Sequence, residues 1–239
     1  MASPKEVVDE AAEIQARKTG SPSEIKADFD RILLETEKEV HRVYLEHEMK
    51  YGAAVLKAFV DHLVTTGEIS KLANAGEGIS RHFKLLDGFY LSLGNSRKSR
   101  AGSAFESIHN SLFKKLGYPF EEQVVINGKP DFLMPSAEHF RKNPPDCIIF
   151  TAKRTIRERW RQIVTEGTRG LGFFLATIDD KVSDNQLKEM LEHRIYLVVP
   201  EEIRDRKYKG KENVMSFREF FEDHLDPKVA LWRRKGVIQ

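Results

Sequence analysis

The first 92 residues place apolar side chains at the three- and four-residue intervals of amphipathic helices. One apolar stripe consists of Ile25, Phe29, Ile32, Leu33 and Val40. A second stripe precedes Thr65-Thr66-Gly67 and consists of Val55, Leu56, Phe59, Val60 and Leu63. We therefore expect residues 1–92 to form a helical region with at least two separate helices.

The pattern changes after Gly94-Asn95-Ser96, where we expect the helical region to end. One more amphipathic helix reaches Gly117, and short apolar runs follow it. These runs predict strands at 122–126, 131–134, 147–152, 173–178 and 195–199, and helices at 156–167 and 183–193. Asn127-Gly128 is a strong signal for a hairpin between the first two strands. Strands that alternate with helices indicate an α/β core with a mixed sheet, which we place at residues 93–239.

The amino-acid composition excludes only a few classes of protein. The chain has 239 residues and a formal net charge of +2, so total charge does not indicate a nucleic-acid binder. Its distribution along the chain matters more. The single cysteine, Cys147, rules out an intrachain disulfide and a cysteine-based zinc site. No segment approaches 18 consecutive apolar residues and the first 25 residues have no apolar signal region, so we expect a soluble intracellular protein.

Two polar side chains stand at the ends of predicted strands in a spacing that suits phosphodiester hydrolysis. Asp131 starts one strand, and Lys153 ends the next apolar strand twenty-two residues later. Hydrolysis of a phosphodiester needs a divalent metal held by carboxylates, and a cation near the attacking water. This is the pattern of PD-(D/E)XK nucleases with one departure, because Thr151 occupies the place of the second carboxylate. Glu166, thirteen residues after Lys153, is the candidate replacement.

A rival aspartate, Asp146, precedes Lys153 by seven residues. It lies on the same predicted strand as that lysine, so we expect it to face solvent or to cap the strand. Asp131 by itself could be an ordinary turn residue, and only its spacing to Lys153 and Glu166 favours catalysis.

Three sequence blocks resemble the EcoRII–PspGI–SsoII group of type II restriction endonucleases, whose relatives include NgoMIV. They are Arg97–Gly102 with Glu106, Lys129–Phe132, and Lys153–Gln162. The resemblance covers about residues 95–170. It implies a restriction-endonuclease-like core, with a mixed sheet flanked by helices, plus the N-terminal helical region.

The resemblance also implies the roles of the site residues. Asp131 and Glu166 would hold Mg²⁺, Lys153 would position and activate the water, and Glu106 would lie near the metal. In that group the second carboxylate has moved to the helix after the lysine, which is the position of Glu166.

Base recognition falls to Arg157, Glu158 and Arg159 by the same resemblance. Arginine donates two hydrogen bonds to guanine and glutamate accepts from cytosine, so this triplet suits a CC–GG site. CCWGG is favoured and CCNGG comes next. Arg97, Lys98 and Arg100 are predicted to contact backbone phosphates. Phe59 is a weaker candidate for stacking on a flipped central base.

These features predict a site-specific deoxyribonuclease that cuts double-stranded DNA and leaves 5′-phosphates. A palindromic site requires two active sites related by a two-fold axis, so we expect a homodimer, with dimer contacts and flanking DNA contacts from residues 1–92. A cognate DNA methyltransferase would act on the same site without having to bind, in the cytoplasm of a prokaryotic cell. The alternatives are a structure-specific repair or recombination nuclease of the same fold, and an inactive DNA-binding protein.

Overall fold

The computed structural model describes residues 6–7, 10–11, 20–70, 74–126, 128–156 and 172–239. The predicted helix at 156–167 lies almost wholly outside these residues, as do Arg157, Glu158, Arg159 and Glu166. Among the described helices, none is both long enough and apolar enough to cross a membrane.

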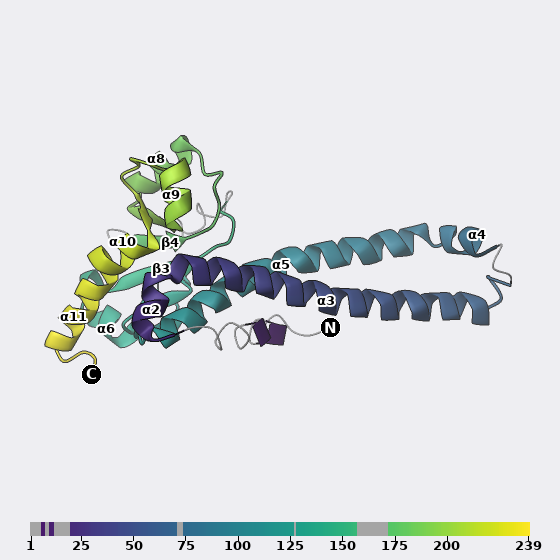
Figure 1. Ribbon diagram of the computed structural model, residues 1–239, viewed down its shortest axis with the longest axis horizontal. Coiled ribbons are helices and arrows are strands. Elements are labelled where there is room, and N and C mark those ends of the chain that lie inside the picture. The colour runs from purple at the N-terminus through teal and green to yellow at the C-terminus, as the bar shows by residue number, and fades with distance from the viewer. Residues whose placement is uncertain (1–5, 8–9, 12–19, 71–73, 127, 157–171) are drawn as a thin grey trace.

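A long helical hairpin projects from one side of the sheet (Figure 1). Helix α2 (Pro22–Ala27) leads into α3 (Phe29–Thr65), and α4 (Ala75–Ser80) leads back into α5 (Phe83–Lys115). With 37 residues, α3 extends over about 55 Å. The helical character predicted for the N-terminal region is confirmed in the described part.

Two details of the helical prediction are wrong. Apart from Ile25, which lies in α2, the two apolar stripes predicted as separate helices share one continuous helix, α3. The expected break at Gly94-Asn95-Ser96 is absent, because α5 runs without interruption through it. Leu93 is buried just before the glycine, so burial of this part of the helix outweighs its low helix propensity. The predicted boundary between the helical region (residues 1–92) and the α/β core (residues 93–239) therefore falls inside the single helix α5.

The sheet has six strands in sequence order: β1 (Glu121–Glu122), β2 (Phe132–Met134), β3 (Ile148–Ala152), β4 (Phe173–Ala176), β5 (Ile195–Val199) and β6 (Val214–Ser216). Strands β1 to β3 pair antiparallel, and β3 to β6 pair parallel. The predicted α/β class with a mixed sheet is confirmed.

Shorter helices complete the fold. They are α6 (Ala137–Lys142), a 3-10 turn (Pro144–Asp146), α8 (Asp184–Glu192), α9 (Glu201–Lys207), α10 (Phe217–Glu219), a π-helical turn (Phe220–Leu225) and α11 (Asp226–Arg234). The helix predicted at 183–193 is thus confirmed as α8. The elements after residue 200 were not predicted.

Alternating side chains of the strands fill two cores, one on each face of the sheet. Phe150 faces the core formed with α3, α5 and the C-terminal helices, whereas its neighbour Ile149 faces the core that includes α8. Burial on both faces explains why β3 reads as one continuous apolar run.

The predicted strand at 122–126 is wrong beyond Glu122. The backbone at Gln123 has φ +54°, which takes the chain out of the extended conformation. The strand ends there, and Gln123 turns toward the start of β2.

Candidate active site

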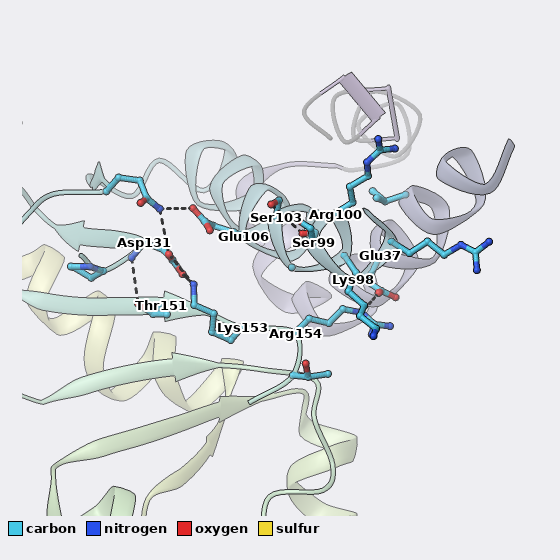
Figure 2. A pocket seen from close by; sticks show the side chains of 18 of the residues that line it. Glu37, Lys98, Ser99, Arg100, Ser103, Glu106, Asp131, Thr151, Lys153 and Arg154 are labelled. Atoms are coloured by element: carbon cyan, nitrogen blue, oxygen red, sulfur yellow. Dashed lines mark hydrogen bonds and ion pairs between the residues drawn. The ribbon is translucent and has the colours of Figure 1, made fainter. Parts of the chain in front are cut away.

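A cleft of about 1140 Å³ lies between the helical hairpin and the ends of β2 and β3. Its walls include Glu106, Asp131, Lys153 and Arg154, together with Lys98 and Glu37 (Figure 2). The predicted catalytic residues that the structure describes are thus brought to one place. They come from helix α5, the start of β2 and the end of β3.

Asp131 is nearly buried and fully hydrogen-bonded. Its side chain is 5% exposed, and Oδ2 accepts from the backbone N–H of Ala152 at 2.9 Å. Lys153 Nζ lies 2.9 Å from Oδ2 and 3.1 Å from Oδ1. Because β2 and β3 are antiparallel, with Phe132 opposite Phe150, the aspartate just before β2 meets the lysine just after β3.

Thr151 has a structural task at the place where the nuclease pattern carries a second carboxylate. Its Oγ1 accepts a hydrogen bond from the backbone N–H of Asp131 at 3.3 Å. The threonine is buried, so an unpaired hydroxyl at this position would be costly. The departure from the pattern therefore helps to fix the backbone of the aspartate.

Glu106 projects from α5 toward Asp131. Burial and the negative charge of Asp131 raise the pKa of the Glu106 carboxyl, while Lys153 acts in the opposite direction. Gln123 Nε2 donates to Glu106 Oε1 at 2.7 Å and lies 3.4 Å from Asp131 Oδ1. No sequence pattern indicated Gln123, because its position depends on the turn of the chain after β1.

Asp131 and Glu106 fit a divalent cation. Both present carboxylate oxygens to the same cleft, and oxygen ligands are those that magnesium prefers. Burial is the main cause of the raised pKa of Glu106, and the negative charge of Asp131 raises it further; a bound cation would counter both effects. Among the described residues there is no group of three or more histidine, cysteine, aspartate or glutamate side chains at metal-binding distance. Glu166 lies outside them.

The basic cluster predicted to contact phosphate lies along the cleft wall formed by α5, where Arg97, Lys98 and Arg100 all line it. Arg97 forms an ion pair with the nearly buried Glu48 of α3, with Nε 2.8 and 2.9 Å from its two oxygens. The Arg100 guanidinium lies over the ring of Tyr44, 4.7 Å from its centre. Arg97 thus joins the two long helices, and the phosphate contacts of the cluster stay predictions.

Phe59 is not brought to the cleft. It lies on the distal half of α3 and packs edge-on against His82, with the rings 5.4 Å apart. It follows Tyr44, the α3 residue of the cleft wall nearest to it in sequence, by fifteen helical positions, which is about 22 Å along the axis.

Asp146 lies at the other end of β3 from Lys153, as the sequence suggested. It ends a 3-10 turn before the strand, and its Oδ2 is 2.5 Å from Lys235 Nζ. The hydrogen bond from Lys235 lowers the pKa of Asp146. This aspartate therefore anchors the C-terminal helix and is not part of the cleft.

The segment after Lys153 is anchored to the loop that follows β4. The Thr177 hydroxyl donates to the carbonyl of Arg154 at 3.1 Å, and Asp179 Oδ2 accepts from the backbone N–H of Ile156 at 3.0 Å. Tyr208 in turn donates to the carbonyl of Asp179 at 2.8 Å. These bonds fix the backbone between the candidate catalytic lysine and the predicted base-reading triplet.

Asp179→Ala should therefore reduce both stability and cleavage. The Ile156 N–H would lose its acceptor, which should lower the free energy of unfolding by about 1–3 kcal/mol. Misplacement of the chain beside Lys153 should lower the cleavage rate roughly tenfold or more. Urea unfolding and plasmid cleavage measure the two effects. Asp180→Ala is the control, since Asp180 pairs only loosely with the exposed Arg206 at 3.4 Å; equal losses in both variants would contradict the anchoring role.

The fold is shared with solved restriction endonucleases. Ecl18kI, solved metal-depleted in complex with uncleaved DNA, aligns with all of this chain and 82% of its own, with a TM-score of 0.85 and 23% identity. The endonuclease PspGI, solved in a substrate DNA complex, aligns with 97% of this chain and 94% of its own, with a TM-score of 0.68 and 21% identity. The sheet therefore defines a PD-(D/E)XK-type fold.

The sequence matches the family model described as EcoRII C terminal over residues 68–221. The chain belongs to this family, and the predicted membership of the group is confirmed. The matched range begins within the predicted helical region, so the match includes part of the hairpin.

Two relatives carry the same resemblance in sequence. The type II restriction enzyme SsoII of Shigella sonnei is 33% identical over an alignment of 156 residues that covers 60% of this chain and 50% of that protein. The type II restriction enzyme EcoRII of Escherichia coli is 38% identical over an alignment of 123 residues that covers 49% of this chain and 30% of that protein. The matched part thus spans half of the length of SsoII and less than a third of the length of EcoRII.

Proposed function

We propose that this protein is a type II site-specific deoxyribonuclease that hydrolyses phosphodiester bonds of double-stranded DNA with the help of Mg²⁺. The observation that carries the proposal is the contact of Asp131 with Lys153 at adjacent strand ends, with Glu106 beside them in one cleft. The names of the relatives and the DNA in the two related complexes support the same activity.

Each described residue has a chemical task in this proposal. Asp131 and Glu106 provide oxygen ligands for the cation, and we expect Glu166 to add another. Lys153 holds Asp131 in place in the DNA-free protein and provides a positive charge beside the scissile phosphate. Magnesium, when bound, neutralises phosphate charge and lowers the pKa of a water molecule. The products would be DNA ends that carry 5′-phosphates.

For the recognition site we propose a CC–GG sequence, with CCWGG favoured and CCNGG next. Arg157, Glu158 and Arg159 would read the bases. These three residues directly follow Ile156, whose backbone N–H is held by Asp179 in the loop after β4. The base-reading residues would therefore lie only a few residues from Lys153 along an anchored backbone.

We further propose a homodimer, because a palindromic site requires two copies of the cleft. The apolar surface of the hairpin supports this state. Of the ten exposed large hydrophobic side chains in the described part, nine lie on α3 and α5: Leu45, Met49, Tyr51, Val60, Val64, Phe83, Leu85, Tyr90 and Leu91. A surface of this kind is typical of protein interfaces, and we assign it to the second copy. Light scattering should then give twice the 27.5 kDa of one chain.

Plasmid digestion with and without magnesium, followed by sequencing of the fragment ends, tests the proposed activity. We expect discrete fragments only with magnesium, with a shared CC–GG sequence at their ends and 5′-phosphates that a ligase accepts. The shared sequence also identifies the central base.

Two other outcomes would point elsewhere. Cleavage without a common sequence would favour a repair or recombination nuclease of the same fold. Salt-dependent DNA binding without cleavage would favour an inactive DNA-binding protein.

A further inference from the structure

Arg154 is held by a carboxylate that lies apart from the candidate metal site. Its Nε is 2.5 Å from Oε1 of Glu37, which reaches across from α3. Both side chains line the same cleft as Asp131 and Lys153 (Figure 2). The Glu37 side chain is only 18% exposed and that of Arg154 is 38% exposed, so the carboxylate is the more sheltered partner and the arginine side chain remains partly open to solvent.

Glu37 lies in a wall that is otherwise basic. Of the described acidic residues that line the cleft, Glu106 and Asp131 interact at the candidate metal site, and Glu37 is the remaining one. Lys98 and Arg100 of α5 line the same cleft (Figure 2). A carboxylate at this position repels phosphate and cancels one positive charge that DNA would otherwise meet.

The backbone of Arg154 does not depend on this ion pair. The N–H of Lys153 donates to the carbonyl of Ala176 at 2.9 Å, and the carbonyl of Arg154 accepts from Thr177. The side chain can therefore exchange its partner while Lys153 stays in place. Arginine forms two parallel hydrogen bonds with phosphate as readily as with carboxylate, so a DNA phosphate is a suitable replacement for Glu37.

We propose that Arg154 is a phosphate ligand and that Glu37 masks it in the DNA-free protein. A phosphate oxygen of DNA takes the place of the Glu37 carboxylate on the guanidinium. This ion pair, here called the Glu37 mask, weakens the sequence-independent part of DNA binding, which depends on charge. It leaves hydrogen bonds to the bases unaffected. This inference rests on the proposed function, because it requires DNA in this cleft.

DNA binding in EDTA at a series of salt concentrations tests the mask without cleavage. The probes are two short duplexes, one with a single CCWGG site and one without CC or GG. Glu37→Gln should bind both about threefold tighter or more, and the slope of log affinity against log salt should steepen by about one. Arg154→Gln should bind about threefold more weakly, with a slope shallower by about one. The double variant should return close to the wild type, because it again has no net charge at this position.

Glu35→Gln is the matched control. Glu35 lies on the same helix, is exposed and pairs with Arg31 at 3.3 Å, outside the cleft. It should change neither affinity nor slope. If wild-type protein binds DNA while Glu37→Gln and Arg154→Gln keep its slope, the mask is overturned and the proposed function stands. If the wild type binds neither duplex, the proposed function fails and the mask fails with it.

Discussion

Replacing Asp131 with asparagine is expected to lower the rate of DNA cleavage by about a thousandfold. The change removes one of the two described carboxylates at the candidate metal site, and it leaves Lys153 without its counter-charge. The carboxamide oxygen can still accept from the Ala152 N–H, so the fold should persist. Initial rates of plasmid linearisation in magnesium measure the effect. Binding in EDTA should be kept or strengthened, because a negative charge is lost.

Asp146→Asn is the matched control for this experiment. It removes an aspartate at the opposite end of the same strand, where the carboxylate bonds Lys235. Cleavage should stay within a few-fold of the wild type. An Asp131→Asn rate within tenfold of the wild type would mean that this cleft is not the active site, and equal losses in both variants would indicate a general loss of structure.

Acidification from pH 6.5 to 4 is expected to remove about 3 kcal/mol of stability through His109 alone. This histidine is fully buried on α5, and burial lowers its pKa from 6.5 to about 4. Its Nδ1 donates to the carbonyl of Phe105 at 2.8 Å. The ring packs among Phe29, Phe105, Phe113, Phe150 and Phe217.

The sign follows from the direction of this shift. Above pH 6.5 the histidine is neutral in both the folded and the unfolded chain, and it adds no pH dependence. Below 6.5 the unfolded chain binds a proton that the folded protein excludes until about pH 4. The free energy of unfolding therefore falls by about 1.4 kcal/mol per pH unit in this window.

His109→Leu isolates this contribution. Leucine fills a similar volume and does not titrate, and all other titrating groups are the same in both proteins. Urea unfolding at several pH values should show that the wild type loses about 3 kcal/mol more than the variant between pH 6.5 and 4. Parallel curves for the two proteins would show that His109 gains or loses its proton equally in the folded and unfolded states.

Local patterns were sufficient to predict the parts of the fold that are regular over short distances. β5 was predicted residue for residue, and β3 and α8 to within a residue at each end. Their apolar side chains follow the period of the element itself, so the signal is present in any window of the sequence. The elements at 201–234 gave too short or too weak a pattern to be predicted.

The residues of the candidate site likewise divide into those that local patterns could predict and those that they could not. Asp131 and Lys153 could be paired from the sequence because each stands at the end of an apolar strand and the two strands are consecutive. Gln123 could not be found, because its place beside Glu106 requires the chain to turn at a positive φ. Phe59 was a choice among the apolar residues of one helix, and only the direction of the hairpin shows how far it lies from the cleft.

The sequence by itself determined the α/β class, the family and the pair of Asp131 with Lys153. These depend on periodicity and on short motifs, in which neighbouring residues carry the information. The tertiary structure decided that Thr151 holds the backbone of Asp131, that Glu48 neutralises Arg97 and that Glu37 holds Arg154. The last two contacts join residues 49 and 117 positions apart, and the partner of a charged side chain over such separations is set by how the hairpin packs on the sheet.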